Sequence, residues 1–438
     1  MAWYDEQSKM VSAHGAGITK ENGCYYLFGE FKGDDGNAFK GFSCYSSSNL
    51  CNWAFESIAL PVQESGRLGP NRVGERPKVM KCPKTGEFVM FMHTDDINCK
   101  DPCVGYATSN TINGVYTFRG PLEMNGSTIK KWDMGVFQDD DGTGYLITHS
   151  GNLFRLDANY KSIAEQVVKD MTGKCESPAI FKRNRTYYWL GSDLTGWERN
   201  DNYYFTADSL KGPWKNRGHF APKGSLTWNS QTTFVLPIIG EQKTTYMFMG
   251  DRWAFPRQNS AATYVWQPLE FTGDELSIPK YQEGWKIDKA SGAWEPSILE
   301  GEIVDDSALD RIIYSGDWTA AEKSEKFKDM RAAQKDGQMS LEFTGSQIGL
   351  FGVARPDGGF GRVEILDKDG SPVITTIIET YCAYPESSLK FLSPRLPHGN
   401  YKLRLTVLGE HFTWTTKKGK VWGSTGDFVS LDKFIILK

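Results

Sequence analysis

The chain of 438 residues lacks the features that would place it in a membrane or on a nucleic acid. No apolar run approaches the roughly 18 residues that a membrane-spanning helix needs. No basic run stands out, and a formal net charge of −4 with both signs mixed gives no signal for binding a polyanion. We therefore expect neither a membrane nor a nucleic acid among the partners of this protein.

The first residues, 1–6, lack the apolar core of a signal peptide, so either the protein is cytosolic or a presequence has been removed. The eight cysteines form no paired CxxC set with a histidine at zinc spacing, which argues against a zinc site. Their even number and two glycosylation sequons, at Asn125 and Asn184, favour a secreted and partly disulfide-bonded protein. We expect a monomer that requires no cofactor.

Helical periodicity is nearly missing from residue 3 to about residue 271, where a pattern of strands and turns recurs five times. Each time, a polar residue leads into a short apolar run, and a turn containing glycine then precedes an aromatic strand. The leading segments are 14–18, 75–80, 133–137, 176–181 and 231–235, and the aromatic strands are 25–30, 88–93, 145–150, 187–192 and 246–252. Strand-rich repeats of about 40 to 50 residues are typical of propeller blades. The sequence therefore predicts an all-β protein whose residues 1–290 form a five-bladed β-propeller catalytic domain.

The polar residues that open the five leading segments are the candidate site. In a propeller the innermost strands surround one axis, so His14, Glu75, Asp133, Glu176 and Gln231 become neighbours at one end of a central funnel. Three carboxylates at close range are costly as mere structure, because like charges disfavour ionisation. We interpret the cluster as a functional site.

Glu176 is the candidate general acid. It opens the run Ser177 to Phe181 at the rim of a buried sheet, where burial raises the pKa of a carboxyl group as a general acid requires. A glutamate in a turn before an ordinary strand is the alternative for this segment alone. The recurrence of the pattern along the chain favours the site.

Aromatic side chains beside polar groups at the funnel mouth suit a sugar, whose apolar face stacks on a ring while its hydroxyl groups form hydrogen bonds. Thr195 and Trp197 follow the fourth aromatic strand, and Asp251 closes the fifth. With 14 tryptophans in the chain, core packing remains the alternative for any one of them.

Residues 297–438 change character and predict a second domain. Strand-like runs at 339–343, 359–365, 401–407 and 428–436 no longer follow the earlier pattern, and we predict a β-sandwich of jelly-roll type that resembles carbohydrate-binding modules. Asp305 and Asp306 opposite Asp432 could hold a structural calcium ion, although a solvated edge is the favoured interpretation. For Trp318, Trp414 and Trp422 we expect core packing rather than sugar binding.

With these motifs in hand, the chain resembles glycoside hydrolase family 43, a family of inverting enzymes on a five-bladed propeller. Residues 13–18 with 25–30, residues 75–79 and residues 230–234 resemble its exo-β-1,3-galactanase branch, and the resemblance covers roughly residues 3 to 285. It implies release of galactose from β-1,3-galactan. By resemblance, Glu176 is the general acid, Asp133 tunes it, Glu30 and Glu75 hold the terminal galactose, and Thr195 and Asn152 lie beside that sugar.

One departure concerns the general base. Most of the family carries an aspartate in the first blade, whereas this strand offers His14 and no carboxylate; the galactanase branch shares this and has Gln231 facing the expected water. We therefore expect Gln231 to orient the nucleophilic water, with Glu75 as the next residue to test. Two alternatives stay open: another family 43 activity such as an α-L-arabinofuranosidase, and a non-catalytic sugar-binding propeller.

Overall fold

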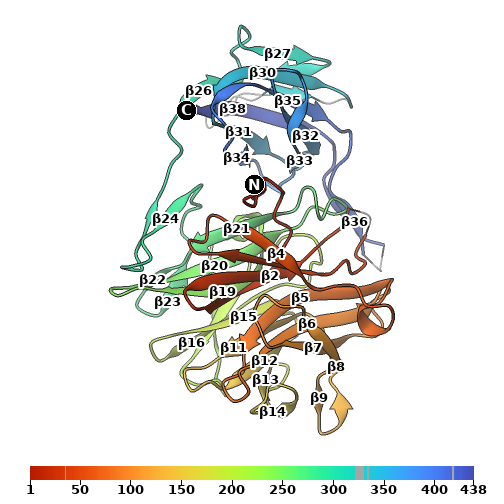
Figure 1. Cartoon of the computed structure of the whole chain (residues 1–438), viewed down its shortest axis with the longest axis vertical. Helices are drawn as coiled ribbons and strands as arrows, with labels where there is room; N and C mark the ends of the chain where they lie inside the picture. The colour runs from red at the N-terminus through yellow and green to blue at the C-terminus, as the bar shows by residue number, and fades with distance from the viewer. Residues whose placement is uncertain (35, 321–329, 333–334, 417–418) are drawn as a thin grey trace.

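The computed structural model describes residues 1–438 apart from 35, 321–329, 333–334 and 417–418. The described part is almost entirely β-structure, and its helical elements are the short turns η1 (Gly66–Leu68) and α1 (Leu226–Asn229). No helix in this part is long and apolar enough to cross a membrane. Figure 1 shows an N-terminal region (residues 1–290) below a C-terminal region (residues 297–438).

Five antiparallel sheets follow one another along the N-terminal region. The first holds β1 (His14–Glu21), β2 (Cys24–Glu30), β3 (Phe42–Ser47) and β4 (Ala54–Leu60), and the second holds β5 (Arg72–Lys81), β6 (Phe88–Asp96), β7 (Cys103–Ser109) and β8 (Thr117–Pro121). The third holds β11 (Met134–Gln138), β12 (Gly144–Thr148), β13 (Asn152–Leu156) and β14 (Ile163–Val168), extended by β9 (Glu123–Met124) and β10 (Ser127–Thr128). The fourth holds β15 (Glu176–Arg183), β16 (Thr186–Ser192), β17 (Tyr203–Ala207) and β18 (Lys215–His219), and the fifth holds β19 (Gln231–Ile239), β20 (Thr244–Arg252) and β21 (Thr263–Pro268).

The first strands of these sheets touch one another in cyclic order: β1 contacts β5, β5 contacts β11, β11 contacts β15, β15 contacts β19, and β19 contacts β1. A separate apolar cluster fills the space between each sheet and the next, and one of the five clusters lies between the fifth sheet and the first. Because both faces of each sheet are covered, the second strands are nearly continuous apolar runs; all seven residues of β16 are buried. The predicted leading segments and aromatic strands coincide with the first and second strands of the five sheets.

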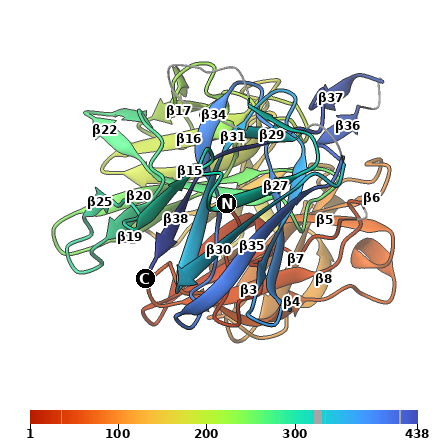
Figure 2. The same ribbon diagram turned by 90° about the horizontal axis from the view of Figure 1, so that it is seen from above.

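Two hairpins follow the fifth sheet. That of β22 (Glu270–Thr272) and β23 (Glu275–Ser277) lies within the N-terminal region, and that of β24 (Trp285–Ile287) and β25 (Trp294–Pro296) leads to the C-terminal region. The C-terminal region has a six-stranded sheet of β28 (Trp318–Ala320), β29 (Met330–Ala332), β38 (Val429–Leu437), β31 (Gln347–Ala354) and β34 (Glu386–Leu392), with β26 (Glu302–Asp305) paired to β38. Its five-stranded sheet runs β27 (Ile312–Ser315), β30 (Gln338–Gly345), β35 (Gly399–Val407), β32 (Phe360–Leu366) and β33 (Pro372–Glu379). One apolar core lies between these two sheets, which Figure 2 shows from above.

The hairpin of β36 (Thr413–Thr415) and β37 (Val421–Gly423) corrects one prediction. Trp318 packs against the core of the C-terminal region as expected, but Trp414 packs in a cluster between the two regions, with its ring against Gly196. Trp422 is the cross-strand partner of Trp414 and is half-buried, and the ammonium group of Lys420 lies over its ring. Sequence alone could not separate an interface tryptophan from a core tryptophan, because both are apolar residues on short strands.

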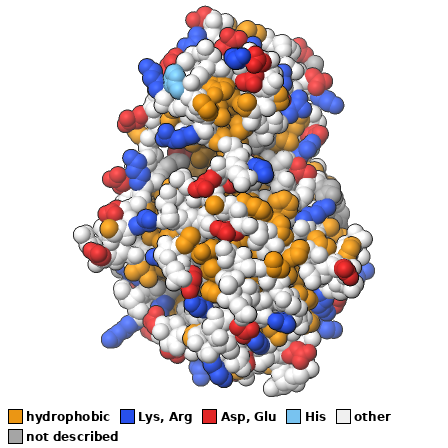
Figure 3. Space-filling model, in the orientation of Figure 1, with side chains coloured by type: hydrophobic (Ala, Val, Ile, Leu, Met, Phe, Trp, Pro, Cys, Tyr) orange, Lys and Arg blue, Asp and Glu red, His pale blue; other side chains and the backbone are white. Residues whose placement is uncertain are grey.

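The cysteines correct another prediction. Seven of them are free thiols, so the expected partial disulfide bonding is wrong for these residues: Cys24, Cys44, Cys51, Cys82, Cys103, Cys175 and Cys382. Charged side chains of both signs are interspersed over the face shown in Figure 3, as the small net charge implies. Among the residues that the structure describes, no three or more His, Cys, Asp or Glu side chains are grouped so that they could hold a metal ion.

Candidate active site

The same local backbone feature delivers three of the predicted residues to one edge of the sheets. His14 and Glu176 begin β1 and β15, and Glu75 is the fourth residue of β5. A bulge follows each of the three, and the next residue has a left-handed backbone: Gly15 (φ 58°), Arg76 (φ 53°) and Ser177 (φ 56°). This conformation costs a residue with a β-carbon about 1–2 kcal/mol, and bulges of this kind redirect side chains beside active sites. The chain therefore accepts strain at this edge.

The residues opposite these positions complete the site. The cross-strand partner of His14 is Glu30, that of Glu75 is His93, that of Glu176 is Ser192, and that of Gln231 is Asp251. The site thus consists of the beginnings of first strands and the ends of second strands, which lie at one edge of every sheet.

Arg76 is the centre of the cluster, and its side chain is 8% exposed. Its Nε pairs with Asp133, and its Nη2 donates to Ser177 Oγ at 2.6 Å and to Gln231 Oε1 at 2.8 Å. Its backbone N–H donates to Glu30 Oε1 at 2.9 Å. Arg76, in the second sheet, therefore contacts the first sheet through its backbone N–H and the third, fourth and fifth sheets through its guanidinium group.

Glu176 has the environment of a general acid. The residue is 8% exposed, and its Oε1 accepts a hydrogen bond of 2.9 Å from Gln231 Nε2. Burial and the negative charge of Asp133 raise its pKa well above the ordinary value, against the opposing effects of Arg76 and the Thr195 backbone. A raised pKa favours the protonated form of the carboxyl group, which is the form that a general acid needs.

Asp133 faces both the acid and the cation. It lies in a left-handed conformation (φ 44°) directly before β11, accepts the backbone N–H of Ser177, and pairs with Arg76. Its predicted place beside Glu176 agrees with this geometry.

Glu75 forms a charged relay with His93. Its Oε2 lies 3.0 Å from His93 Nδ1, and its Oε1 accepts 2.8 Å from Asn37 Nδ2. Burial alone would raise the pKa of Glu75, but the hydrogen bond and charge of His93 outweigh it and lower that pKa. Burial lowers the pKa of His93, but its partners Asp95 and Glu75 raise it more, so that the net result is a pKa of about 9. At neutral pH the pair is ionised, and the Glu75 side chain is 21% exposed, open enough to meet a ligand.

The pKa of Glu30 shifts in the opposite direction to that of Glu75. Glu30 Oε2 lies 2.5 Å from Lys32 Nζ, yet burial outweighs this cation and raises the pKa of Glu30. Lys32 Nζ also donates to Asn37 at 2.8 Å and lies 5.4 Å from the ring centre of Trp197 and 5.7 Å from that of Trp253. Hydrogen-bonding groups and aromatic rings therefore meet here, as a sugar site requires.

Gln231 is held in a single orientation. Its Oε1 accepts from Arg76 Nη2 at 2.8 Å and from Trp253 Nε1 at 2.9 Å, while its Nε2 donates to Glu176 Oε1 at 2.9 Å and to Ser192 Oγ at 3.3 Å. A flipped amide would face two donors with its own NH₂ group. The sequence predicted Gln231 across the sugar ring from Glu176, whereas the structure places the two side chains in direct contact. All four residues of α1, which ends two residues before Gln231, have positive φ between 52° and 60°.

Other predicted residues differ in accessibility. His14 and Asp251 are buried beneath the site at 0% and 1% exposure, with His14 Nδ1 3.5 Å from Asp251 Oδ1. Asn152 is fully buried and uses its amide on His149, Asp170 and Gln166. It has no hydrogen-bonding group free for a sugar, so its predicted role is wrong and we assign it a structural one.

Thr195 and Trp197 lie beside the acid cluster, and their predicted contacts with sugar stay a prediction. Thr195 Oγ1 donates to Glu198 O at 2.6 Å and accepts from Asn200 at 2.7 Å, and the ring of Trp197 lies 5.0 Å edge-on from that of Trp253. Both side chains are half-buried.

Sequence reasoning missed the cations and the indole that organise the acids. Lys78 is 1% exposed, donates to Gly15 O at 2.5 Å, and has a pKa lowered to about 7 by burial and by Arg76. The only available signal was the alternation of Arg76 and Lys78 two residues apart in a strand that should be apolar. Lys32 and Trp253 follow second strands and carried no such signal.

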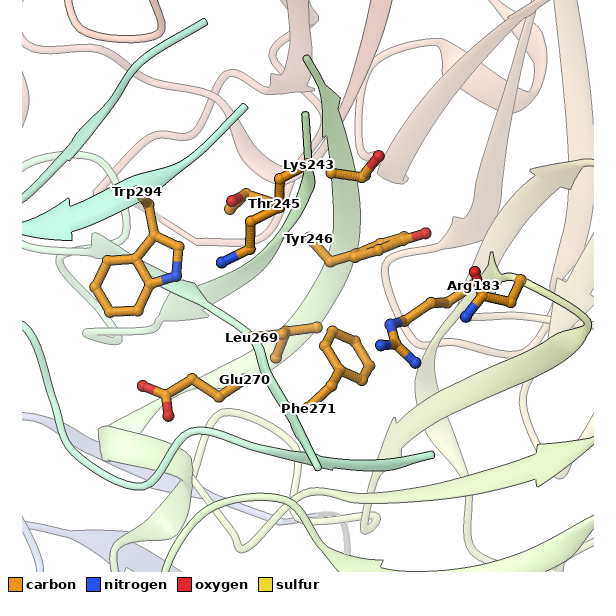
Figure 4. Close-up of a pocket in the computed structure, with 10 residues that line it drawn as sticks. Arg183, Lys243, Thr245, Tyr246, Leu269, Glu270, Phe271 and Trp294 are labelled. Atoms are coloured by element: carbon orange, nitrogen blue, oxygen red, sulfur yellow. The ribbon is translucent and has the colours of Figure 1, made fainter. Parts of the chain in front are cut away.

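A surface hollow of about 620 Å³ lies elsewhere in the described chain (Figure 4). It is lined by Arg183, Glu270, Phe271 and Trp294 among others. Arg183 ends β15 whereas Glu176 begins it. At 3.3 Å per residue, the Cα atoms of these two residues are up to about 23 Å apart. We exclude the hollow from the site because no residue of the acid cluster lines it.

The chain is similar to several known proteins. The profile of glycosyl hydrolases family 43 matches residues 12–225. A crystal structure of exo-β-1,3-galactanase from Phanerochaete chrysosporium, determined with galactose, is 28% identical with a TM-score of 0.73, over 100% of this chain and 98% of that chain. A putative exo-β-1,3-galactanase from Bifidobacterium bifidum is 35% identical with a TM-score of 0.60, over 63% of this chain and 94% of that one.

A third solved structure, an exo-β-1,3-galactanase from Clostridium thermocellum, is 26% identical with a TM-score of 0.63, over 89% of this chain and 98% of that one. A search of curated proteins found no match. The chain belongs to glycosyl hydrolases family 43 and resembles that family's exo-β-1,3-galactanases.

Proposed function

We propose that this protein is an exo-acting, inverting glycoside hydrolase that releases galactose from β-1,3-galactan, the backbone of arabinogalactan. The observation that carries the proposal is the buried Glu176, whose pKa is raised by burial and by Asp133 in a cluster that also holds Glu30 and Glu75. The galactanase structures similar over 89–100% of the chain support galactan as the substrate.

In this mechanism Glu176 protonates the oxygen of the leaving sugar. The raised pKa favours the protonated acid. The negative charge that remains on Glu176 after transfer is stabilised by the hydrogen bond from Gln231 Nε2 and by the positive charge of Arg76. Asp133 sustains the high pKa while its own charge is balanced by Arg76. The protonated Glu176, held in place by its neighbours, promotes departure of the leaving sugar.

Glu75 and Glu30 hold the terminal galactose. Glu75 supplies an ionised, partly exposed acceptor for sugar hydroxyl groups, and an epimer that leaves a buried polar group unpaired is rejected. Because Gln231 contacts Glu176 directly, we assign the attacking water on the opposite face to Glu75, the ionised and partly exposed carboxylate that can accept its proton. Inversion requires that this water attack the face opposite Glu176.

The five sheets serve as the blades of a five-bladed β-propeller catalytic domain in this proposal. The cyclic contacts of the first strands and the five inter-sheet clusters support it. The two-sheet C-terminal region is a β-sandwich domain of the kind found in carbohydrate-binding modules, supported by its single core. Secretion and a monomeric state stay predictions from the sequence.

Product analysis tests the proposed function. The protein is incubated separately with unbranched β-1,3-galactan and with arabinan, and the sugars released are separated by chromatography. Galactose as the sole early product from galactan, with α-galactose formed first by NMR, is the expected result. Arabinose from arabinan would favour an α-L-arabinofuranosidase, and sugar binding without turnover would favour a non-catalytic propeller.

A further inference from the structure

The interface between the two regions is built around a buried arginine. Arg199, in the loop after β16, has a side chain with 0% exposure. Its Cζ lies 4.6 Å from the ring centre of Phe412 and 5.4 Å from that of Tyr381, both in the C-terminal region. These two rings also pack on Ala254, directly after Trp253. A charge in such a place is costly unless it is paired.

The partner of Arg199 comes from the C-terminal region. Arg199 Nη2 donates to Oε2 of Glu379 at 2.7 Å, and the Glu379 side chain is 5% exposed at the end of β33. The same Nη2 donates to the backbone carbonyl of Trp253. Glu198 Oε1 lies 3.9 Å from the other terminal nitrogen, Nη1, so Arg199 has a second carboxylate to turn toward if Glu379 is neutralised.

Trp253 connects this interface to the active site. It is 2% exposed, its carbonyl faces Arg199, and its indole Nε1 donates to Gln231 Oε1 at 2.9 Å. Gln231 Nε2 donates in turn to Glu176 Oε1 at 2.9 Å. Four successive polar contacts therefore lead from Glu379 to the carboxyl group of Glu176.

We propose that Glu379, in the C-terminal region, is a positioning residue for the active site: through Arg199 it holds Trp253, and through Trp253 it fixes the amide of Gln231 against Glu176. This inference rests on the proposed function, because it assigns Glu176 the role of acid. It gives the C-terminal region a part in catalysis that does not depend on that region binding sugar. Loss of the contact loosens the acid without removing any group that touches the terminal sugar.

The test compares two isosteric substitutions at ion pairs that cross the same interface. Glu379→Gln replaces the buried carboxyl group, whose pKa is raised by burial to about 7, with an amide of the same shape. Glu410→Gln is the matched control, because Glu410 Oε2 lies 2.6 Å from Arg257 Nη2 but the two side chains are 50% and 26% exposed and neither touches Trp253. kcat and KM are measured on a β-1,3-galacto-oligosaccharide and on an aryl β-galactoside with a good leaving group, together with the melting temperature.

We expect Glu379→Gln to lower kcat on the oligosaccharide about tenfold, which corresponds to about 1.4 kcal/mol of transition-state stabilisation. KM should stay within about twofold, and the aryl substrate should lose less than about threefold, because a good leaving group depends less on its proton. Glu410→Gln should match the wild type in every measurement. Trp253→Phe removes the indole N–H while keeping an aromatic ring, so it should show the same contrast between substrates even if Glu379→Gln does not fold.

Equal losses on the two substrates would show a general structural role and overturn the inference, as would wild-type kinetics in both Glu379→Gln and Trp253→Phe. These outcomes differ from failure of the proposed function, in which the wild-type protein itself releases no galactose from the oligosaccharide.

Discussion

Gln231→Glu places a second carboxylate against the candidate acid, and the structure allows the effect to be sized. Gln231 Nε2 lies 2.9 Å from Glu176 Oε1, and two unit charges at that distance repel by roughly 6 kcal/mol at an effective dielectric constant of about 20, equivalent to about 4 pH units. Arg76, 2.8 Å from the amide oxygen, offsets most of this repulsion. The remaining repulsion keeps one proton on the pair of carboxyl groups to a higher pH.

The assay is the pH dependence of kcat/KM for galactose release. In the wild type, activity falls as the pH rises through the pKa of Glu176, because the acid must be protonated. In Gln231→Glu this basic limb should move upward by at least about one pH unit, although the maximal rate falls because the amide N–H is lost. Gln231→Met, which adds no charge, is the control. A limb that stays in place or moves to lower pH would refute the contact between Gln231 and the titrating acid.

Three further outcomes follow from the contacts of the site. Glu30→Gln and Glu75→Gln should each raise KM by about ten- to a hundredfold, since a hydrogen bond to a charged group contributes about 1.5–3 kcal/mol; calorimetry with galactose checks this, and unchanged affinity in both would place the sugar elsewhere. Because the pKa of His93 is raised from 6.5 to about 9, its stabilising effect is full below pH 6.5 and lost as the pH rises through 9, so the melting temperature should fall over that range in the wild type and less in His93→Gln. Asn152→Ala should lower the melting temperature and leave KM unchanged, and a raised KM would restore its role in binding sugar.

The sequence was sufficient to group the acids because each lies at or near the start of a first strand. The repeat spacing identified those strands, and cyclic packing brings their first residues together, so Glu75, Asp133, Glu176 and Gln231 could be grouped without coordinates. The predicted strands of the C-terminal region coincide with β30, β32, β35 and β38, because the alternation of apolar and polar residues along them is clear.

The network that connects these residues was not predictable. Arg76 reaches the centre of the cluster because a bulge after Glu75 and a left-handed backbone turn it inward, and nothing in the residue types at 75–78 specifies that bulge. The link between Glu379 and Arg199 depends on how the two regions pack, which joins residues 180 positions apart. Asn152 was misassigned because a buried, fully bonded amide and an exposed one look alike in a sequence.

The most direct test of the account is the activity of Glu176→Gln on unbranched β-1,3-galactan. General acid catalysis contributes about 10²–10⁴ in rate, so galactose release should fall at least about a hundredfold, while galactose binding is retained and an aryl galactoside with a good leaving group is hydrolysed with a much smaller loss. Galactan hydrolysis by Glu176→Gln at close to the wild-type rate would contradict the assignment of Glu176 as the acid.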